Sequence, residues 1–253
     1  MAADKKIALV TGASSGIGRA SALALVKSGF MVAVTGRREA ELKETATLAG
    51  NLSANILPIV GDVSDPDSVT RLFETVIKQH GRLDVLFNNA GVAIHGTDTI
   101  DLPLDKWEYL MRINVTGAFL CAQQALRIMK NQDPKGGRII NNGSISAHVP
   151  RARALAYTVS KHAITGMTKS IALDYRDDNI CCSQIDIGNA AVKRTEEVAK
   201  GARIQADGVK RAEPQIDVAI VANTVAYIAN LPLDVNVPFM TIMANAMPLM
   251  GRG

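Results

Sequence analysis

Tyr157 and Lys161 are separated by one helical turn, and Ser144 precedes Tyr157 by thirteen residues. Residues i and i+4 of a helix lie on one face, so the ammonium of Lys161 is expected beside the phenol of Tyr157. A phenol has a pKa near about 10 and exchanges protons poorly at neutral pH, but a cation within roughly 4–6 Å lowers that pKa. The spacing therefore predicts a general acid–base centre, although such a pair alone is more often a surface helix pair.

A glycine-rich turn near the amino terminus supplies a second chemical signal. Residues 6–10 are apolar and strand-like, residues 11–18 read Thr-Gly-Ala-Ser-Ser-Gly-Ile-Gly, and a helical pattern follows. Such a turn lets the backbone approach a pyrophosphate, and the first amides of the helix face the negative charge. The alternative is a tight strand-to-helix connection without a ligand, which the downstream Tyr157–Lys161 pair disfavours. The predicted phosphate contacts are Gly12, Ser14, Ser15, Gly16, Ile17 and Gly18.

These segments together resemble the short-chain dehydrogenase/reductase family, specifically its single-domain, 3-oxoacyl-reductase-like type. The matching residues, in the family's order and approximate spacing, are Thr11 to Gly18, Asn88-Asn89-Ala90-Gly91, Asn114, Ser144, Tyr157 and Lys161. They lie within residues 1–190, and the remainder fits the family less well. The resemblance implies an enzyme that moves hydride to or from nicotinamide.

Composition limits the other classes of function. A chain of 253 residues with 47% hydrophobic content and no internal repeat is expected to form a single domain, residues 1–253. The formal charge of +4 comes from scattered basic residues with few aromatics, so nucleic-acid binding is not expected. No apolar run approaches a membrane span, no export signal precedes the first strand, and three cysteines argue against a disulfide framework. We therefore expect a cytoplasmic protein, and the four histidines lack metal-ligand spacing.

Apolar runs alternate with helical patterns along the chain. This alternation predicts an α/β fold, a doubly wound, parallel, seven-stranded, Rossmann-like sheet with helices on both faces. Strands are expected near 6–11, 31–36, 56–61, 83–87, 137–142, 180–186 and 237–243, and helices near 17–29, 38–50, 66–80, 104–130, 157–176 and 215–230. Ligands of such sheets bind beyond the carboxyl ends of the strands, where the non-helical motifs above fall.

The end of the second strand bears on the choice of cofactor. Gly36 stands where relatives that use NAD carry an acidic residue, and Arg37 and Arg38 follow it. Arginines there offer charge-assisted bonds to a 2′-phosphate. Solvated arginines are the alternative, but the helix dipole disfavours cations at this helix start. We predict NADP(H), with NAD still open because Ser15 stands where many NADP-using relatives carry a basic residue.

The resemblance extends the cofactor site to two further strand ends. It implies that Asp62 accepts from the adenine amino group and that Val63 flanks the ring, although Asp62 could instead cap the next helix. It implies that Asn89, Ala90 and Gly91 pass against the adenosine ribose, with Asn88 structural. An ordinary turn is the alternative for the second segment.

The resemblance also assigns the chemistry. It implies that Tyr157 is the proton donor or base, that Ser144 hydrogen-bonds the substrate oxygen, and that Lys161 supports Tyr157 and the nicotinamide ribose. Asn114, a poor residue within a helix, would hold a water that links Lys161 to solvent. The alternatives are a simple turn serine, with Ser146 as a weaker candidate, and an exposed helical asparagine. His95 and His148 lie in loops near this expected pocket.

The region after the sixth strand departs from the family's pattern. Gly188 is present, but Ile187 replaces a proline and Val192 replaces a threonine that contacts the cofactor. Ile187 would still offer its backbone N–H to the carboxamide. Asp186 is an unusual strand-end carboxylate, expected as a cap or ion-pair partner, with contact to a cationic or hydroxylated substrate as the alternative. A mobile helical lid over the substrate is expected at residues 189–214, whose charged residues Lys193, Arg194, Glu196, Glu197 and Lys200 read as a solvated face.

The carboxyl-terminal segment is rich in methionine, which suits core or subunit-contact packing. Relatives commonly form tetramers, so a homotetramer is expected from the resemblance. Small residues of the preceding helix would form its contact face, namely Ala222, Val225, Ala226 and Ala229.

The sequence thus predicts an NADP(H)-dependent oxidoreductase that acts on a small-molecule carbonyl/alcohol pair. An NAD-dependent alcohol dehydrogenase of the same fold is the enzymatic alternative. A non-catalytic protein that senses nicotinamide redox state is the alternative from another class. The intact Asn114, Ser144, Tyr157 and Lys161 argue against such a sensor, since it needs no proton relay.

Overall fold

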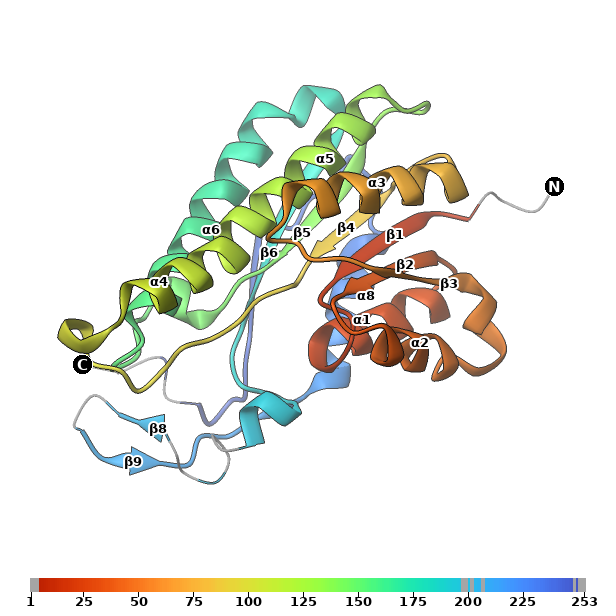
Figure 1. Ribbon diagram of the computed structural model, residues 1–253. Coiled ribbons are helices and arrows are strands. Elements are labelled where there is room, and N and C mark those ends of the chain that lie inside the picture. Colours follow the sequence, from red (N-terminus) through yellow and green to blue (C-terminus); the bar gives the residue numbers. More distant parts are fainter. Residues whose placement is uncertain (1–4, 197–199, 201–202, 206–207, 248, 250–253) are drawn as a thin grey trace.

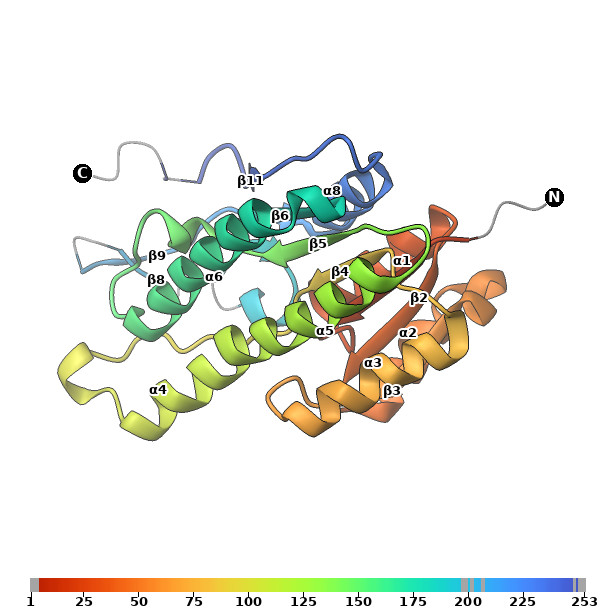
Figure 2. The same cartoon turned by 90° about the horizontal axis from the view of Figure 1, so that it is seen from above.

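The computed structural model describes residues 5–196, 200, 203–205, 208–247 and 249. Within these residues seven parallel strands form one sheet in the order β11-β6-β5-β4-β1-β2-β3 (Figures 1 and 2). The strands are β1 (Ile7–Thr11), β2 (Met31–Gly36), β3 (Ile56–Val60), β4 (Val85–Asn88), β5 (Gly137–Asn142), β6 (Ile180–Ile187) and β11 (Phe239–Ile242). The expected fold class and strand positions are confirmed. Strand order reverses at β1, which pairs with both β2 and β4, so a crevice is expected beyond these carboxyl ends.

Helices cover both faces of this sheet. Helices α1 (Gly16–Lys27), α2 (Glu39–Thr47) and α8 (Val218–Asn230) lie on one face, and α3 (Pro66–His80), α5 (Ala118–Asn131) and α6 (Leu155–Asp174) lie on the other (Figures 1 and 2). Each layer encloses its own apolar core. Because both faces are covered, β1 and β6 are buried along their whole length. This burial explains the apolar run of β1, whereas β6 also buries the polar residues Ser183, Gln184 and Asp186.

The expected helix at 104–130 is divided into three parts. Helix α4 (Leu104–Met111) continues into a π-helical segment, Arg112–Gly117, and then into α5. The π-helical segment widens the backbone at Asn114, whose side chain is buried. Such segments occur frequently at functional sites. The reading of Asn114 as an exposed helical residue is therefore wrong.

The small-residue face of α8, which was expected to contact another subunit, is buried within the protein. Ala222, Val225, Ala226 and Ala229 are all buried, and α8 packs against α1 within the protein. Small side chains let these two helices approach closely, so the prediction of a subunit contact at this face is wrong. The exposed apolar residues of α8 are Ile220 and Tyr227.

Met247 and the three cysteines are buried in the interior, and Met243 is partly buried. A Cβ added at Gly188 would lie 2.6 Å from Met243 Cβ and 3.0 Å from Met247 Sδ, so these methionines pack directly on the end of β6. All three cysteines are buried and free, as expected. Burial raises the pKa of the Cys121 and Cys182 thiols to about 12. In the described part of the chain, no helix combines the length and apolar character needed to span a bilayer.

Residues 189–214 are less helical than expected. Strand β7 (Ala190–Ala191) pairs with β10 (Ile216–Asp217), and one 3-10 turn covers Lys193–Thr195. Strands β8 (Arg203–Ile204) and β9 (Lys210–Arg211) form an antiparallel hairpin at the end of the molecule where the parallel strands terminate (Figure 1). Apart from this turn and Glu196, the described residues of the segment are not helical, and its role as a lid stays a prediction. Glu197 lies outside the described residues.

Candidate active site

The glycine turn after β1 is fixed by contacts that leave no room for side chains. Gly12 has φ +66°, and a Cβ there would lie 2.8 Å from the Cα of Ala90. A Cβ on Gly18 would collide with the carbonyl of Gly12 and lie 2.6 Å from Asn89 Nδ2. These positions require glycine because β1, α1 and the segment after β4 meet there.

The first turn of α1 has the properties of an anion site. Ser15 is the N-cap, but its side chain makes no capping bond, and the first turn contains no acidic residue. The amides of this turn are therefore available to a phosphate, to which the helix dipole adds favourable charge. The cavity over this turn is lined by Gly12, Ser15, Gly16, Ile17, Gly18, Asn89, Ala90, Gly91, Val192 and Lys193. These features fit the pyrophosphate of a dinucleotide.

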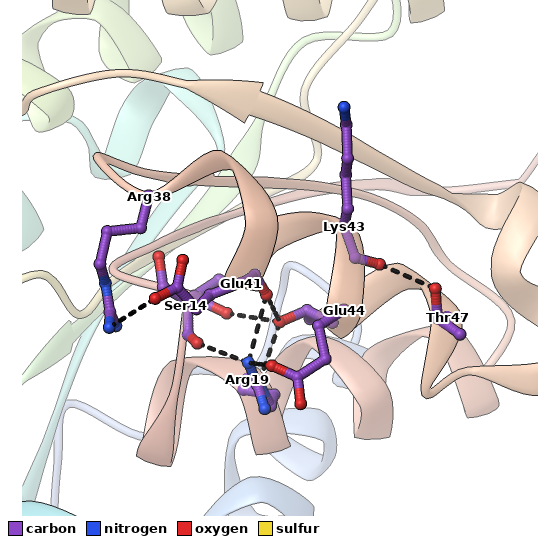
Figure 3. Close-up of polar contacts among 9 residues, drawn as sticks. Ser14, Arg19, Arg38, Glu41, Lys43, Glu44 and Thr47 are labelled. Carbon is purple, nitrogen blue, oxygen red and sulfur yellow. Dashed lines mark hydrogen bonds and ion pairs between the residues drawn. The ribbon is translucent and has the colours of Figure 1, made fainter.

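Arg19 anchors the glycine turn to α2. Its guanidinium donates to the carbonyl of Ser14 at 2.7 Å and to Glu44 Oε2 at 2.6 Å (Figure 3). Thr45 Oγ1 accepts from Arg19 Nε at 3.1 Å and donates to the carbonyl of Ala13 or Glu41. Because these bonds occupy the guanidinium, Arg19 supports the turn and does not face a ligand.

At the expected adenosine end of the groove, the guanidinium of Arg37 is exposed. Its cavity includes Ser14, Gly36, Arg37, Arg38 and Asp62. A Cβ at Gly36 would lie against Ser14 Oγ, so a larger side chain at this position would require the Ser14 hydroxyl to rotate. Arg38 is paired with Glu41 at 2.9 Å (Figure 3), whereas exposed Arg37 has no hydrogen bond or ion pair with any described residue.

Asp62 lies at the third strand end, facing the same cavity. Its Oδ1 accepts from the backbone N–H and the hydroxyl of Ser64, and the cap of α3 is Asp65. The reading of Asp62 as that helix cap is therefore wrong. Partial burial raises the pKa of Asp62, but the Ser64 bonds and the charges of Arg37 and Arg112 outweigh it, so the pKa lies below its ordinary value. Val63 lines this cavity beside Asp62.

The segment after β4 is bound to the glycine turn. Thr11 Oγ1 accepts from the backbone N–H groups of Asn89 and Ala90, both at 2.9 Å, and Asn89 Nδ2 donates to the carbonyl of Thr11 at 2.8 Å. Asn88 is buried and donates to the carbonyl of Ala118 at 2.8 Å, a structural role as expected. Ala90 and Gly91 line the cavities over the glycine turn and toward Asp62.

Tyr157 and Lys161 lie on one face of α6, one turn apart. Lys161 Nζ stands 5.6 Å from the centre of the Tyr157 ring and donates to the carbonyl of Asn142 at 2.6 Å. Asn142 in turn donates through its amide to Asn89 Oδ1 at 2.7 Å. The ammonium is thus fixed beside the phenol, and Asn142 links this pair to the nucleotide-binding turn.

Ser144 follows β5 and faces the cleft that contains Tyr157. It caps a short 3-10 turn, Ile145–Ala147, and its Oγ accepts from the N–H of Ser146 at 3.1 Å. That bond uses an acceptor lone pair and leaves the hydroxyl hydrogen for another oxygen. Ser146 also lines the cleft, and its buried hydroxyl has no partner within the described chain.

The buried carboxamide of Asn114 binds the loop after β4. Its Oδ1 accepts from the N–H of Val92 at 2.8 Å and its Nδ2 donates to the carbonyl of Val92 at 2.9 Å. Nδ2 also donates to Ser160 Oγ at 3.2 Å, and Ser160 bonds the carbonyl of Tyr157. Asn114 therefore joins the π-helical segment, this loop and α6.

The cleft around Tyr157 adjoins the nucleotide groove. Its lining comprises Ile17, Ala93, His95, Asn142, Gly143, Ser144, Ile145, Ser146, Arg151, Tyr157, Ile187, Gly188, Asn189, Ala190, Val192 and Thr195. Ile17 and Val192 also line the cavity over the glycine turn. The His95 and Tyr157 rings meet edge to face, with centroids 5.2 Å apart. The predicted residues of chemistry and of nucleotide binding thus share one groove.

A charged cluster borders this cleft. Arg151 pairs with Glu213 Oε2 at 2.7 Å, and Asn189 Nδ2 donates to the same oxygen at 2.7 Å. Burial raises the pKa of Glu213, but hydrogen bonds from Asn189 and Gln205 and the charge of Arg151 outweigh it and lower the pKa to about 2. We call Arg151, Asn189 and Glu213 the latch, since it joins the loop after Ser144 to residues 203–213.

Polar residues of this groove that sequence reasoning missed include Asn142, Arg151 and Thr195, and Lys193 was expected only in the lid. Thr195 stands three positions after Val192, lines the cleft and bonds the carbonyl of Val192 at 2.9 Å. A search for the family's threonine a few residues downstream could have found it. No local pattern marks Arg151 or Asn142, whose partners lie far away in the sequence. In the described chain, no group of three His, Cys, Asp or Glu residues could hold a metal ion.

A family model of the short chain dehydrogenases matches residues 6–203. The chain belongs to this family. Its members are dehydrogenases and reductases that act on hydroxyl and carbonyl groups and share an NAD(P)-binding fold.

The named relatives of this chain differ in the substrate that their names give, and the chain spans just under two thirds of the length of one of them. It is 36% identical over 182 residues to a 3beta-hydroxysteroid dehydrogenase of Mediterraneibacter gnavus, covering 72% of this chain and 65% of that protein. It is 32% identical over 200 residues to a 3-oxoacyl-[acyl-carrier-protein] reductase of Synechocystis, covering 76% and 77%. The crystal structure of acetoin dehydrogenase YohF from Salmonella typhimurium superposes with TM-score 0.80 and 33% identity, covering 94% of this chain and 95% of that one. The family and the fold are therefore shared, while the substrates in the names of these relatives range from a steroid to acetoin.

Proposed function

We propose that this short-chain dehydrogenase is an NADP(H)-dependent oxidoreductase acting on a small carbonyl/alcohol substrate, with Tyr157 as general acid or base. The observation that carries the proposal is that Lys161 lies over the Tyr157 ring and donates to Asn142, whose amide donates to Asn89 at the glycine turn. It sets the acid–base pair at a fixed position relative to the nucleotide groove. A protein that only senses the nucleotide has no need of this arrangement.

When bound, the nicotinamide supplies or accepts the hydride. In the reductive direction Tyr157 donates its phenolic proton to the carbonyl oxygen, and Ser144 donates a hydrogen bond to the same oxygen and orients it. The Lys161 ammonium stabilises the phenolate that remains, because the two groups are held within one helical turn. In the oxidative direction the same groups act in reverse, with Tyr157 as the base.

Reprotonation of Tyr157 requires a path to solvent, and we assign this path to Asn114. The carboxamide of Asn114 is already bonded to Val92 and Ser160, so it positions the π-helical segment and α6. The relay water would then bind the main chain of this segment. The burial of Asn114 next to α6 supports the assignment.

Two features favour NADP(H) over NAD(H). Gly36 lacks the acidic side chain that would accept from a ribose 2′-hydroxyl, and Arg37 offers an exposed guanidinium in the same cavity. The guanidinium of Arg37 is available to a 2′-phosphate because it forms no ion pair with a described residue. Asp62 and Val63 would contact the adenine, and Ile187 and Gly188 the carboxamide.

We further propose that residues 1–253 act as one domain in a cytoplasmic homotetramer, with residues 189–214 closing over the substrate. An apolar groove between α5 and α6 supports association, since it exposes Phe119 and includes Leu126, Met167 and Tyr175. Light scattering after size-exclusion chromatography tests this proposal. A mass equal to one chain would contradict it.

The direct test is turnover of a panel of carbonyl compounds with NADPH and with NADH. The panel should contain 3-oxoacyl thioesters, 3-oxosteroids, sugars and acetoin-like hydroxyketones. We expect at least one carbonyl to be reduced, with NADPH preferred. Tight NADPH binding with no turnover of any member would instead support a sensing protein.

A further inference from the structure

Asp186 is a fully buried carboxylate directly behind Ser144. Its exposed fraction is 0%, and it lies one residue before the end of β6. Its Oδ1 accepts from the backbone N–H of Ser144 at 3.0 Å, and its Oδ2 lies 2.7 Å from His148 Nε2. A carboxylate without such donors would not be stable in this interior position. Both ends of the 3-10 turn that begins at Ser144 are thus held by one side chain.

The same carboxylate is connected to the helix that carries Tyr157 and Lys161. Gln184 Nε2 donates to Asp186 Oδ1 at 2.7 Å and to Thr165 Oγ1 at 2.9 Å. Thr165 lies one turn after Lys161 on α6 and donates to the carbonyl of Lys161 at 3.3 Å. Asp186 therefore lies at the centre of a buried polar network that joins α6, β6 and the Ser144 turn.

The approach of the carboxylate to this turn depends on Gly143. A Cβ on Gly143 would collide with Asp186 Oδ1 and lie 2.7 Å from Gln184 Cγ. The backbone before Ser144 is therefore pressed against the carboxylate itself. Because Asp186 is inaccessible and both of its oxygens have partners, contact with a substrate is not its role.

We propose that Asp186 is a positioning residue for Ser144, which rests on the proposed function of Ser144 as the donor to the substrate oxygen. Its carboxylate fixes the main chain of Ser144 relative to Lys161 and Tyr157, so the serine hydroxyl and the phenol converge on one oxygen. His148, half exposed, anchors the outer oxygen of the carboxylate. A displacement of a catalytic group by about 1 Å can cost roughly 100-fold in rate. Loss of the Asp186 carboxylate should therefore lower kcat measurably.

Amide hydrogen exchange tests the positioning without reference to activity. In Asp186→Ala we expect exchange of the amides in residues 143–147 to rise at least about tenfold, because the Ser144 N–H loses its buried acceptor. Asp186→Asn keeps an acceptor oxygen for Ser144 and, with the other His148 tautomer, a bond to the ring, so it should retain most of the protection. His148→Ala removes only the half-exposed anchor and should give a smaller rise, which keeps the test available if Asp186→Ala does not fold.

Asp84 provides a matched control. Its carboxylate also accepts a backbone N–H, that of Ile7 at 2.7 Å, but at the opposite ends of the strands. Asp84→Ala should lower thermal stability and leave both exchange in residues 143–147 and kcat unchanged. Asp186→Ala should lower kcat by about 10–100-fold while the Kd for NADPH stays within about twofold. The kinetic isotope effect with 4-deuterated NADPH should rise as the chemical step slows.

These readouts separate the two proposals. Unchanged exchange in residues 143–147 of Asp186→Ala, or of His148→Ala if the first variant does not fold, would overturn the positioning role even in an active enzyme. Increased exchange there in a protein that reduces no carbonyl would support the positioning of Ser144 and overturn the proposed function. A fall in melting temperature with normal kcat and a normal isotope effect would reduce Asp186 to a structural residue.

Discussion

The glycine turn after β1 and the cleft around Tyr157 are built from different kinds of contact. At the turn, backbone meets backbone: Gly12 and Gly18 admit no Cβ, and Thr11 bonds the main chain after β4. At the cleft, side chains far apart in the sequence hold the structure, as in the Asp186–His148 pair and the latch of Arg151, Asn189 and Glu213. The first design depends on the shape of the backbone, whereas the second depends on the identity of particular side chains.

This difference predicts how each region responds to substitution. A change at the turn meets rigid backbone and should act in an all-or-none manner on cofactor binding. A change at the cleft removes one of several side-chain contacts and should act in a graded manner on turnover. Residues that bond both regions should be the most sensitive.

Lys161 is linked to both regions, because it donates to Asn142 and Asn142 donates to Asn89, and it should show the largest effect. Lys161→Met removes the cation beside Tyr157 and the bond to Asn142, so kcat should fall by roughly 10²–10⁴-fold. The Kd for NADPH should also rise, since the ammonium is expected to reach the nicotinamide ribose. Steady-state kinetics and fluorescence titration measure the two quantities. A loss confined to stability would remove Lys161 from the proposed mechanism.

Gly18→Ala tests the backbone design of the turn. The new Cβ would collide with the carbonyl of Gly12, so we expect the affinity for NADPH to fall by about 100-fold or more. Gly166 on α6 is a matched helical glycine whose Cβ would meet nothing within 4 Å. Gly166→Ala should raise stability by about 0.5–1 kcal/mol and leave affinity unchanged. Equal affinities in the two variants would show that the turn tolerates side chains.

Arg37→Ala sharpens the assignment of the cofactor. Loss of a charge-assisted bond to a 2′-phosphate should weaken NADPH binding by about 10–100-fold and leave NADH binding nearly unchanged. Arg38→Ala is the comparison, and its effect should be smaller because Arg38 is paired with Glu41. Isothermal titration with both nucleotides measures the preference. Equal losses for NADPH and NADH would contradict the role of Arg37.

Substitutions in the latch should change kcat and KM the least. They should, however, change how the free energy of unfolding depends on pH. Because the pKa of Glu213 is about 2 in the folded protein and about 4.5 when unperturbed, the latch stabilises the fold fully above about pH 5. This contribution is lost as the pH falls from about 4.5 toward about 2.

Glu213→Gln measures the contribution of the latch. The variant should be destabilised at pH 7 by up to about 3 kcal/mol, since Arg151 loses its buried counter-ion. The difference from the wild type should shrink as the pH falls below 4.5, while KM for the carbonyl changes only a few-fold at most. Urea unfolding from pH 3 to pH 7 checks this, and a constant difference would refute the linkage.

The difference between local backbone contacts and long-range side-chain contacts also explains which features could be predicted from the sequence. The glycine turn, the strands and the Tyr157–Lys161 spacing depend on local patterns, so their positions could be predicted. The π-helical segment around Asn114 leaves no mark in the apolar periodicity, and the predicted helix ran through it. The buried role of Ala222 required knowledge of its neighbour α1, and the partners of Asp186 and Glu213 required the fold.

The most direct test of the central claim is Tyr157→Phe, with kcat and the NADPH dissociation constant measured on the same preparation. The substitution removes one oxygen and leaves the ring beside His95 and Lys161 in place. We predict that kcat falls by at least about 100-fold while the dissociation constant stays within about twofold. Turnover close to that of the wild type would contradict the assignment of Tyr157 as the proton-transferring group.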